Sequence, residues 1–345
     1  MRKLLILVSA VALVVAFTLP AAAEVSFYGN IRMMTFWESF DPDTPGADTT
    51  SDLAWTWDDG SSRVGARFKH DSVGANVEMR PRSASDVRHW NGTWDFGGGT
   101  LLIGQAWSET FSCVSSSICE GGLSGGRGDT YGSLRIPQVA VHLGSLHIAG
   151  ATPTKANLAG GTSTTSIPKI EASYGLKAGP AAIKIYGGFN SSEEEVGATT
   201  YDYSSMLLGA NAVMGFGAAK LGINLYMVNN PKLYGEVGTN AQTNTITGTE
   251  VNDVDSLGFL VDFNYTLSPT MSIYAGYGQV VSELDTPGTN EKTSSYMYVG
   301  LPITLAKGVT LTPEIAITAD EHDTGAATTP APSTTYYGAY WFIAF

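Results

Sequence analysis

The sequence predicts an all-β fold: a transmembrane antiparallel β-barrel of about sixteen strands that follows a cleaved signal peptide. Three observations favour it. The chain ends on an alternating, strongly aromatic segment, and the connections between extended segments alternate between short and long. Charged residues are also few, although the mature chain contains no apolar run long enough for a membrane helix.

Residues 1–23 have the features of a cleaved signal peptide, which leaves residues 24–345 as a single barrel domain. Arg2 and Lys3 precede an apolar run over residues 4–19, and three alanines then form a small-residue cleavage site. The run is short and no basic stop-transfer segment follows it, which disfavours a membrane anchor. Cleavage removes two positive charges from a chain of formal net charge −13 and implies export through the periplasm.

The composition leaves two classes of exported protein open. Only 15% of the residues are charged, against about 25% in soluble domains, while 10% are aromatic and 40 are glycine. Such a chain is either a soluble all-β protein or a transmembrane barrel, in which alternation hides the apolar positions from an average hydropathy. The faces and connections of the strands distinguish the two.

Extended segments follow one another along the mature chain, and we expect each to form one barrel strand. Together with its connection, each takes about 20 residues, which fits tilted spanning strands of roughly 9–11 residues. The segments cover approximately residues 25–38, 52–70, 73–81, 86–96, 100–108, 130–143, 145–152, 167–178, 181–190, 203–215, 218–229, 254–267, 271–283, 294–305, 309–320 and 334–345.

Short connections, such as residues 71–72 and 97–99, alternate with long polar ones, such as residues 41–51 and 109–129. Short periplasmic turns and long extracellular loops are typical of outer-membrane barrels, whereas a β-sandwich gives no reason for strict alternation. Both chain ends then lie on the short-turn side, which requires an even number of strands.

Basic residues share one face of the predicted second strand, where Arg63, Arg67 and Lys69 alternate with apolar residues. A charge that faces lipid at the midplane costs about 2–4 kcal/mol, so we expect these bases to face an aqueous interior. Aromatic residues near strand ends are expected in two interfacial girdles. They are Phe36, Trp37, Trp55, Trp57, Trp94, Tyr203, Phe263, Tyr265, Tyr296 and Tyr298.

The final segment has one apolar face, formed by Tyr337, Ala339, Trp341, Ile343 and Phe345, and a mixed opposite face. Alternate residues of a strand point to the same side, so this segment suits a wall between lipid and water.

Short motifs distributed over the mature chain are Phe-Tyr-Gly at residues 27–29, Ser-Arg-Val-Gly at 62–65, Gly-Thr-Leu-Leu-Ile-Gly at 99–104 and the terminal Phe345. In these motifs the chain resembles the sixteen-stranded general diffusion porins of Gram-negative bacteria. The resemblance implies a homotrimer in the cell outer membrane, in contact with outer-membrane lipid and lipopolysaccharide. It also implies that Tyr337, Trp341, Ile343 and Phe345 form the signal read by the barrel-assembly machinery.

The resemblance further implies that the third long connection folds into the lumen as a constriction. In such porins a basic cluster on the wall faces acidic groups on this loop, and the transverse field orients dipolar solutes. By strand parity we assign Arg32, Arg63, Arg67 and Arg80 to the wall. The opposing loop acids are expected among Glu109, Glu120 and Asp129.

Cys113 and Cys119 are the only cysteines, and both lie in the third long connection. The periplasm and the cell surface are oxidising, so we expect a disulfide between them. Two cysteines without paired histidines fall short of a zinc set, and no metal, cofactor or nucleic-acid partner is expected.

These features predict a water-filled channel for passive diffusion of small hydrophilic solutes and ions, without catalysis. No catalytic grouping emerges around the histidines, which are His70, His89, His142, His147 and His322. A substrate-selective porin and a barrel sheath for a partner protein, such as an electron-transfer cytochrome, stay open as alternatives. The acidic loops favour a slight preference for cations, which a basic constriction would oppose.

Overall fold

In a computed structural model of the protein, the described residues are 24–44, 46–57, 61–80, 86–118, 127–130, 135–235, 241–286, 290–323, 328–329 and 331–345. The predicted signal peptide, residues 1–23, lies outside them. No helix among the described residues has the length and apolar character needed to cross a membrane.

Most of the described chain is β-structure, and it contains one short helix, α2 (Pro231–Tyr234). The strands are β1 (Glu24–Asp41), β2 (Thr50–Trp57), β3 (Arg63–His70), β4 (Val73–Arg80), β5 (Asp86–Asp95), β6 (Thr100–Trp107), β7 (Arg135–Leu143), β8 (Leu146–Ala151), β9 (Thr162–Thr164), β10 (Lys169–Ala178), β11 (Ala181–Val196), β12 (Thr199–Phe216), β13 (Ala219–Asn229), β14 (Thr245–Thr247), β15 (Glu250–Asn252), β16 (Val254–Ser268), β17 (Met271–Leu284), β18 (Glu291–Gly300), β19 (Ile303–Ala306), β20 (Val309–Asp323), β21 (Thr328–Thr329) and β22 (Ser333–Ala344).

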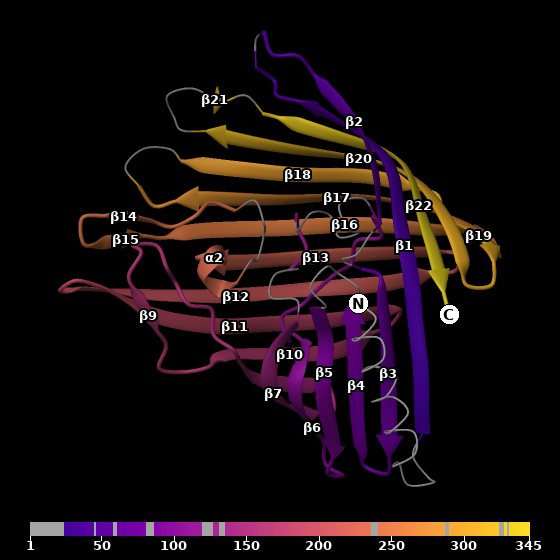
Figure 1. The fold of residues 1–345 in the computed structure, drawn as a ribbon, viewed down its shortest axis with the longest axis horizontal. Helices are drawn as coiled ribbons and strands as arrows, with labels where there is room; N and C mark the ends of the chain where they lie inside the picture. Colours follow the sequence, from indigo (N-terminus) through magenta and orange to yellow (C-terminus); the bar gives the residue numbers. More distant parts are fainter. Residues whose placement is uncertain are drawn as a thin grey trace, which may run out of the picture.

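The strands close into one antiparallel barrel, in which β1 completes the ring by pairing with β22. Three barrel strands are interrupted, because β2 and β3 both pair with β1, β9 and β10 with β11, and β18 and β19 with β20. Counted once each, they give the sixteen barrel positions that the sequence predicts, with β14, β15 and β21 as additions in the connections. In Figure 1, β3 to β5 run steeply, whereas β12 to β18 run nearly horizontally, as strands on different walls of a tilted barrel do.

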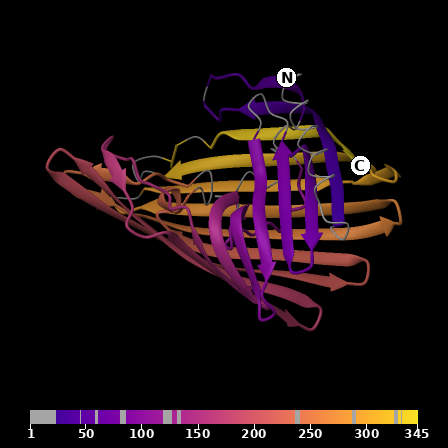
Figure 2. The same ribbon diagram turned by 60° about the horizontal axis from the view of Figure 1, so that its bottom comes forward.

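The wall is uneven in height. Strands β6 and β8 have 8 and 6 residues, whereas β11 and β12 have 16 and 18. Figure 2 shows the long strands extending beyond the short ones on one side of the barrel. The third long connection, residues 108–134, therefore leaves β6 where the opposite wall still continues.

Apolar side chains point out of the barrel and polar ones point in. On β1, Phe27 and Ile31 are exposed, whereas Tyr28 and Arg32 on the other parity are partly buried. The same alternation exposes Leu257 and Val261 on β16 and buries Ser256 and Leu260. A lipid-facing apolar belt around a polar lumen follows from this pattern.

The girdle prediction is correct for only part of the aromatic set. Trp37, Trp55, Trp57, Trp94, Phe263 and Tyr265 are exposed on the outer face. Four of the predicted residues are instead buried, namely Phe36, Tyr203, Tyr296 and Tyr298. The cause is strand parity: Met297 and Val299 take the lipid-facing positions of β18, so the tyrosines between them face inward.

The terminal strand has the predicted orientation. Tyr337, Trp341, Ile343 and Phe345 are exposed on the outer face, and Tyr340 on the other parity is 4% exposed. The strand pairs on one side with β1 and on the other with β20. The end of the chain is thus a fully paired barrel strand.

Candidate functional site

The described residues of the third long connection, called loop L3 here (residues 108–134), fold into the barrel. Its described residues are 108–118 and 127–130, and an isolated bridge between Ser112 and Thr130 brings its two arms together. Its side chains and amides bond to inward-facing groups on the wall formed by β10 to β20. The predicted insertion of this loop is therefore correct.

The first anchor of loop L3 is the carboxylate of Glu171 on β10, which is fully buried. It accepts hydrogen bonds from the Ser108 hydroxyl at 2.7 Å and from the Glu109 amide at 2.9 Å. Lys169 lies 3.5 Å away as its counter-charge. Tyr234 of α2 donates to the same carboxylate at 3.1 Å, so an extracellular segment also joins this anchor.

The second anchor is Asn224 on β13, whose amide side chain joins the two arms of the loop. Its Oδ1 accepts a hydrogen bond from the Ser112 hydroxyl at 2.9 Å, and its Nδ2 donates to the Gly128 carbonyl at 2.8 Å. Nearby, Lys184 donates to the Phe111 carbonyl at 2.9 Å. Polar side chains of the wall thereby replace the strand pairing that the loop backbone lacks.

The third anchor consists of two acids, Asp262 on β16 and Glu314 on β20. Asp262 accepts the Ser116 amide at 2.8 Å and the Ser116 hydroxyl at 2.9 Å. Glu314 accepts the Ser117 hydroxyl and the Ile118 amide, both at 3.0 Å. Hydrogen bonds to charged groups contribute about 1.5–3 kcal/mol each, so these acids hold the tip of the described arm firmly.

Inward-facing tyrosines complete the third anchor. Tyr298 accepts a hydrogen bond from the Ser115 hydroxyl at 3.0 Å and donates to Asp262 at 2.7 Å. Tyr296 and the Ser117 hydroxyl share a hydrogen bond of 2.5 Å. Sequence reasoning placed both rings in a girdle, where they would have had no role in the lumen.

The returning arm of loop L3 lies close against β16 and β17 because glycines meet there. A Cβ atom on Gly278 would lie 2.2 Å from the Arg127 carbonyl oxygen, and one on Gly128 would lie 2.0 Å from the Phe259 carbonyl oxygen. Gly128 also has a φ of +87°, which favours glycine. The Arg127 side chain donates to the Ser294 hydroxyl at 2.8 Å and lies 3.5 Å from Asp320.

Asp129 fastens the two arms of loop L3 to each other. Its fully buried carboxylate accepts the backbone amides of Val114 at 3.1 Å and Ser115 at 3.3 Å. Burial raises the pKa of Asp129 from 3.8 to about 7, although the two amide hydrogen bonds oppose the rise. Its role in the described structure is internal to the loop.

The opposite wall carries arginines that point into the lumen. Arg63 on β3 lies 3.6 Å from Glu78, which also accepts a hydrogen bond of 2.5 Å from Arg88 on β5. Arg67 lies 4.6 Å above the Tyr28 ring, and Arg32 donates to the Tyr340 hydroxyl at 3.3 Å. One buried glutamate thus stands among four arginines, a set that we call the arginine wall: Arg32, Arg63, Arg67 and Arg88.

Arg80, which sequence parity also assigned to the wall, forms an ion pair with Asp86 at the facing ends of β4 and β5. Of the predicted wall residues, Arg32 and Arg63 thus lie in one electrostatic cluster with Arg88, whereas Arg80 has its own acidic partner. Separately, Arg135 of β7 stacks 3.6 Å above the Trp107 ring and donates to His89 at 3.3 Å.

The loop acids do not share one location. Glu109 accepts hydrogen bonds from His142 and His147, and Asp129 is buried inside the loop. Among the described contacts, neither carboxylate bonds to the arginine wall. Glu120 and Cys119 lie outside the described residues, so the constriction role of Glu120 and the disulfide to Cys113 stay predictions.

Sequence reasoning missed several of the groups that build this site, chiefly Glu78, Arg88, Glu171, Asp262 and Glu314. The alternation around Asp262 and Glu314, with Val261, Phe263 and Ile315 on the lipid side, was a usable signal. Around Arg88 there is no such signal in the sequence, because neither parity is clearly apolar. Arg88 and its neighbour His89 are both buried, whereas Trp90 and Trp94 are exposed.

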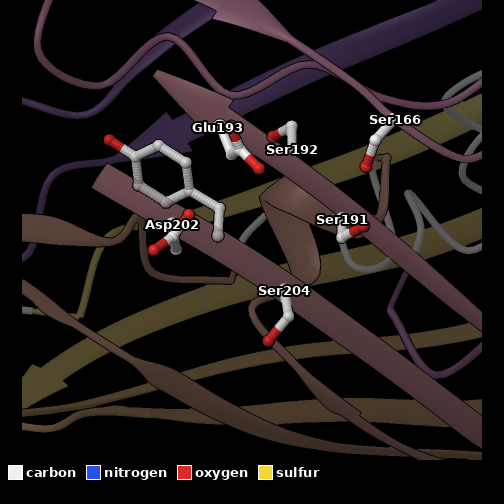
Figure 3. A pocket seen from close by; sticks show the side chains of 7 residues that line it. Ser166, Ser191, Ser192, Glu193, Asp202 and Ser204 are labelled. Atoms are coloured by element: carbon white, nitrogen blue, oxygen red, sulfur yellow. The ribbon is translucent and has the colours of Figure 1, made fainter. Parts of the chain in front are cut away.

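Two cavities mark the ends of the barrel wall. One of about 680 Å³ lies at the short-turn end of β1 and β3 to β6, where Arg67, Lys69, Asn76 and Asn91 line it with other residues. The other, of about 220 Å³, lies on the extensions of β11 and β12 (Figure 3). Its lining includes the exposed side chains of Glu193, Asp202 and Ser204, which lie beyond the lipid-facing Met206.

The comparisons with known proteins agree with this architecture. A family model described as Gram-negative porin matches residues 10–316. No curated protein matches the chain by sequence.

Three solved structures illustrate the likeness. The outer membrane channel DcaP of Acinetobacter baumannii is 16% identical, with 95% of this chain and 99% of that chain covered and a TM-score of 0.70. The trimer form of OmpT, an outer membrane protein of Vibrio cholerae, is 16% identical, with 94% and 100% covered and a TM-score of 0.60. An anion-selective porin from Comamonas acidovorans is 13% identical, with 94% and 100% covered and a TM-score of 0.58.

Proposed function

The chain belongs to the Gram-negative porin family and forms an outer-membrane channel for passive diffusion, and we propose that its constriction admits small anionic solutes in preference to cations. The constriction in this proposal lies between loop L3 and the arginine wall. The observation that carries it is a difference in exposure: acidic side chains near loop L3 are buried, whereas arginines on the opposite wall stay accessible.

The lumenal acids around loop L3 are buried by the loop and hydrogen-bonded to it. Glu171, Asp262 and Glu314 are 0%, 1% and 4% exposed, and each accepts hydrogen bonds from loop residues. Because the loop covers these carboxylates, they do not line the open passage, and a permeating ion does not contact them. On the wall opposite, Arg32 and Arg63 keep part of their surface accessible and Arg67 is exposed.

The charge balance of the arginine wall is positive. The arginine wall has four arginines and one carboxylate, Glu78, which pairs with Arg63 and Arg88. The described arms of loop L3 present serines, Phe111 and Cys113 on their partly accessible side. Charges that line a narrow, low-dielectric passage act on a permeating ion at short range, where salt screens them least. The field at this level should therefore attract anions and orient dipolar solutes.

This proposal reverses the slight preference for cations that the composition suggested. The net charge of the chain is dominated by acids on the long connections and the rim, such as Glu193 and Asp202. These groups act on the outer vestibule, where salt screens exposed charges beyond a Debye length of about 8–10 Å. Local charge at the narrowest level then decides selectivity.

The likeness to the Comamonas acidovorans porin, whose description is anion-selective, is consistent with this proposal. We also propose that the channel is a homotrimer, as the OmpT trimer form is, and that it contacts outer-membrane lipid and lipopolysaccharide. Export through the periplasm after cleavage at residue 23, and insertion by the barrel-assembly machinery, complete the proposal.

The rival functions have less support. Family and fold point to a channel rather than to an enzyme. A sheath for a threaded partner protein needs a wide lumen, whereas three sets of anchors hold loop L3 across this one. A substrate-selective porin differs from the proposed channel only in how strictly the arginine wall discriminates.

Swelling of liposomes that contain the purified protein tests the proposal with uncharged and charged solutes of similar size. We expect faster swelling in gluconate than in glucose, and slower swelling in glucosamine. Equal rates for the three solutes, or the reverse order, would contradict a basic constriction.

A further inference from the structure

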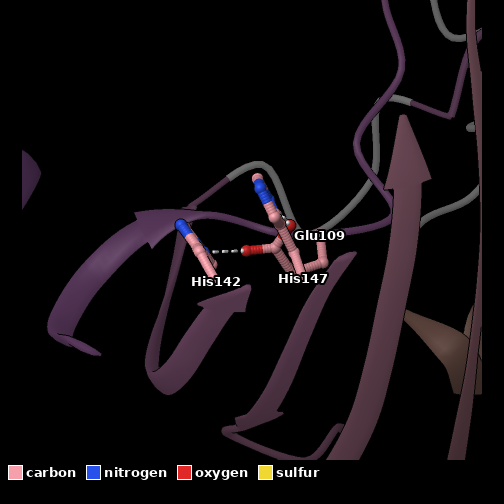
Figure 4. Close-up of side chains that lie close together, drawn as sticks. All are labelled: Glu109, His142 and His147. Carbon is pink, nitrogen blue, oxygen red and sulfur yellow. Dashed lines mark hydrogen bonds and ion pairs between the residues drawn. The ribbon is translucent and has the colours of Figure 1, made fainter. Parts of the chain in front are cut away.

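Three potential ligands, Glu109 of loop L3 and His142 and His147 of the β7–β8 hairpin, lie close together (Figure 4). His142 Nε2 is 2.8 Å from Glu109 Oε1, and His147 Nδ1 is 3.1 Å from Glu109 Oε2. We propose that Glu109, His142 and His147 form a binding site for a divalent transition-metal ion of the zinc type. This inference does not depend on the ion selectivity of the channel.

The spacing of the ligand atoms fits such an ion. All three lie within 4.8 Å of one another. In a tetrahedral zinc site with bonds of about 2.0–2.1 Å, neighbouring ligand atoms are roughly 3.3 Å apart. The observed separations of 2.8 and 3.1 Å are close to that edge, so small side-chain movements would admit an ion.

The backbone fixes the two histidines relative to each other. His142 on β7 and His147 on β8 are directly opposed partners in the hairpin. Their rings stack with centroids 3.8 Å apart and an interplanar angle of 11°. Because neighbouring antiparallel strands hold both residues, little conformational entropy is lost when the two imidazoles bind one ion.

The carboxylate is positioned by a second layer of hydrogen bonds. The Ser173 hydroxyl donates to Glu109 Oε2 at 3.2 Å, and the Glu109 amide donates to the buried Glu171. Bonds of this kind orient metal-binding carboxylates in proteins. Glu109 therefore reaches the histidines from loop L3 in a defined direction.

The site is also reachable and chemically selective. The side chains of His142 and His147 are 25% and 35% exposed, whereas that of Glu109 is 9% exposed. Water can thus complete the coordination from the histidine side, as in zinc sites with three protein ligands. Imidazole nitrogens favour zinc, copper and nickel, whereas magnesium and calcium prefer an all-oxygen set.

Occupancy has a structural consequence because the ligands come from two parts of the chain. Glu109 begins loop L3, and the histidines belong to the β7–β8 hairpin of the wall. A bound ion would cross-link the root of the loop to the barrel and stabilise the inserted conformation by mass action. Without an ion, only the hydrogen bonds between Glu109 and the two histidines would join the loop to the hairpin at this point.

The proposal is tested by titrating zinc into the folded, detergent-solubilised protein in an isothermal titration calorimeter. We expect one equivalent of zinc per chain, no competition from excess magnesium, and at least a roughly tenfold loss of affinity in H142N and in H147N. H70N is the matched control, since His70 on β3 lies outside the cluster, and its affinity should equal that of the native protein.

Cobalt absorption provides a second signature that does not depend on transport. Co²⁺ bound to the native protein should give the intense visible bands of a low-coordinate site, and E109Q should lose them while retaining the heat-modifiable mobility of a folded barrel. No saturable zinc binding, or binding that H142N/H147N leaves unchanged, would overturn the site.

Discussion

Gly29 and Phe345 form a reciprocal pair of backbone hydrogen bonds that joins the first strand to the last residue. The Gly29 amide donates to the Phe345 carbonyl at 2.9 Å, and the Phe345 amide donates to the Gly29 carbonyl at 3.0 Å. The Phe345 ring covers Gly29, where an added Cβ atom would lie 2.6 Å from the ring. The terminal residue is therefore part of the closed wall on its lipid-facing side.

Replacing Phe345 by aspartate should impair assembly into the outer membrane. The substitution puts a charge on the outer face beside Gly29 and removes the ring that, in our proposal, the barrel-assembly machinery reads. We expect a marked fall in surface-exposed, heat-modifiable protein, measured by surface labelling and gel mobility. Phe345→Trp should assemble normally, and equal surface levels of the aspartate variant would count against the closing role of Phe345.

Removing the acids of the third anchor should loosen loop L3. In the double variant Asp262→Asn and Glu314→Gln, hydrogen bonds to two charges are weakened, each worth about 1.5–3 kcal/mol. We expect a noisier single-channel current with a higher mean conductance, because the loop leaves the lumen more often. Glu193→Gln, on the exposed outer face, is the control; an unchanged current in the double variant would mean that these acids do not hold the loop.

The docking of loop L3 should depend on pH through Asp129. Burial raises the pKa of this carboxyl to about 7, above its value of 3.8 in an open loop. A group with a raised pKa in the docked state favours docking most below about pH 4, and that contribution is lost as the pH rises through about 7. The change in docking free energy is on the order of 4 kcal/mol at most.

The measurement is protease susceptibility of loop L3, or its current noise, between pH 4 and pH 8. We expect the native loop to become more susceptible toward pH 8, and Asp129→Asn to show a much flatter profile because it cannot ionise. A native loop that becomes more protected as the pH rises, or a variant with the native profile, would assign the dependence to other groups.

Much of the architecture could be predicted because it depends on alternation within single segments. The sixteen strands and the outward face of Trp341 and Ile343 follow from the period of two and from connection lengths, whereas the insertion of loop L3 was implied by the resemblance to general diffusion porins. The same rule, applied to Met297 and Val299, would have placed Tyr296 and Tyr298 in the lumen, but their aromatic character suggested a girdle instead.

The partners of the lumenal charges could not be predicted, since they depend on how the loop settles against distant strands. Glu109 meets His142 and His147 only because loop L3 turns back along the β7–β8 hairpin. Asp129 looked like a lumenal acid, yet backbone amides of the other loop arm enclose it. Periodicity specifies a face, but it does not specify which groups of a loop meet that face.

The reversal potential in a planar bilayer with a salt gradient tests the central claim most directly. With potassium chloride at unequal concentrations, the native channel should give the sign of anion preference. The triple variant Arg32→Gln, Arg63→Gln and Arg67→Gln should shift that potential toward cation preference, whereas Lys307→Gln, in an exposed turn, should leave it unchanged. Cation preference in the native channel, or a triple variant with the native potential, would contradict control by the arginine wall.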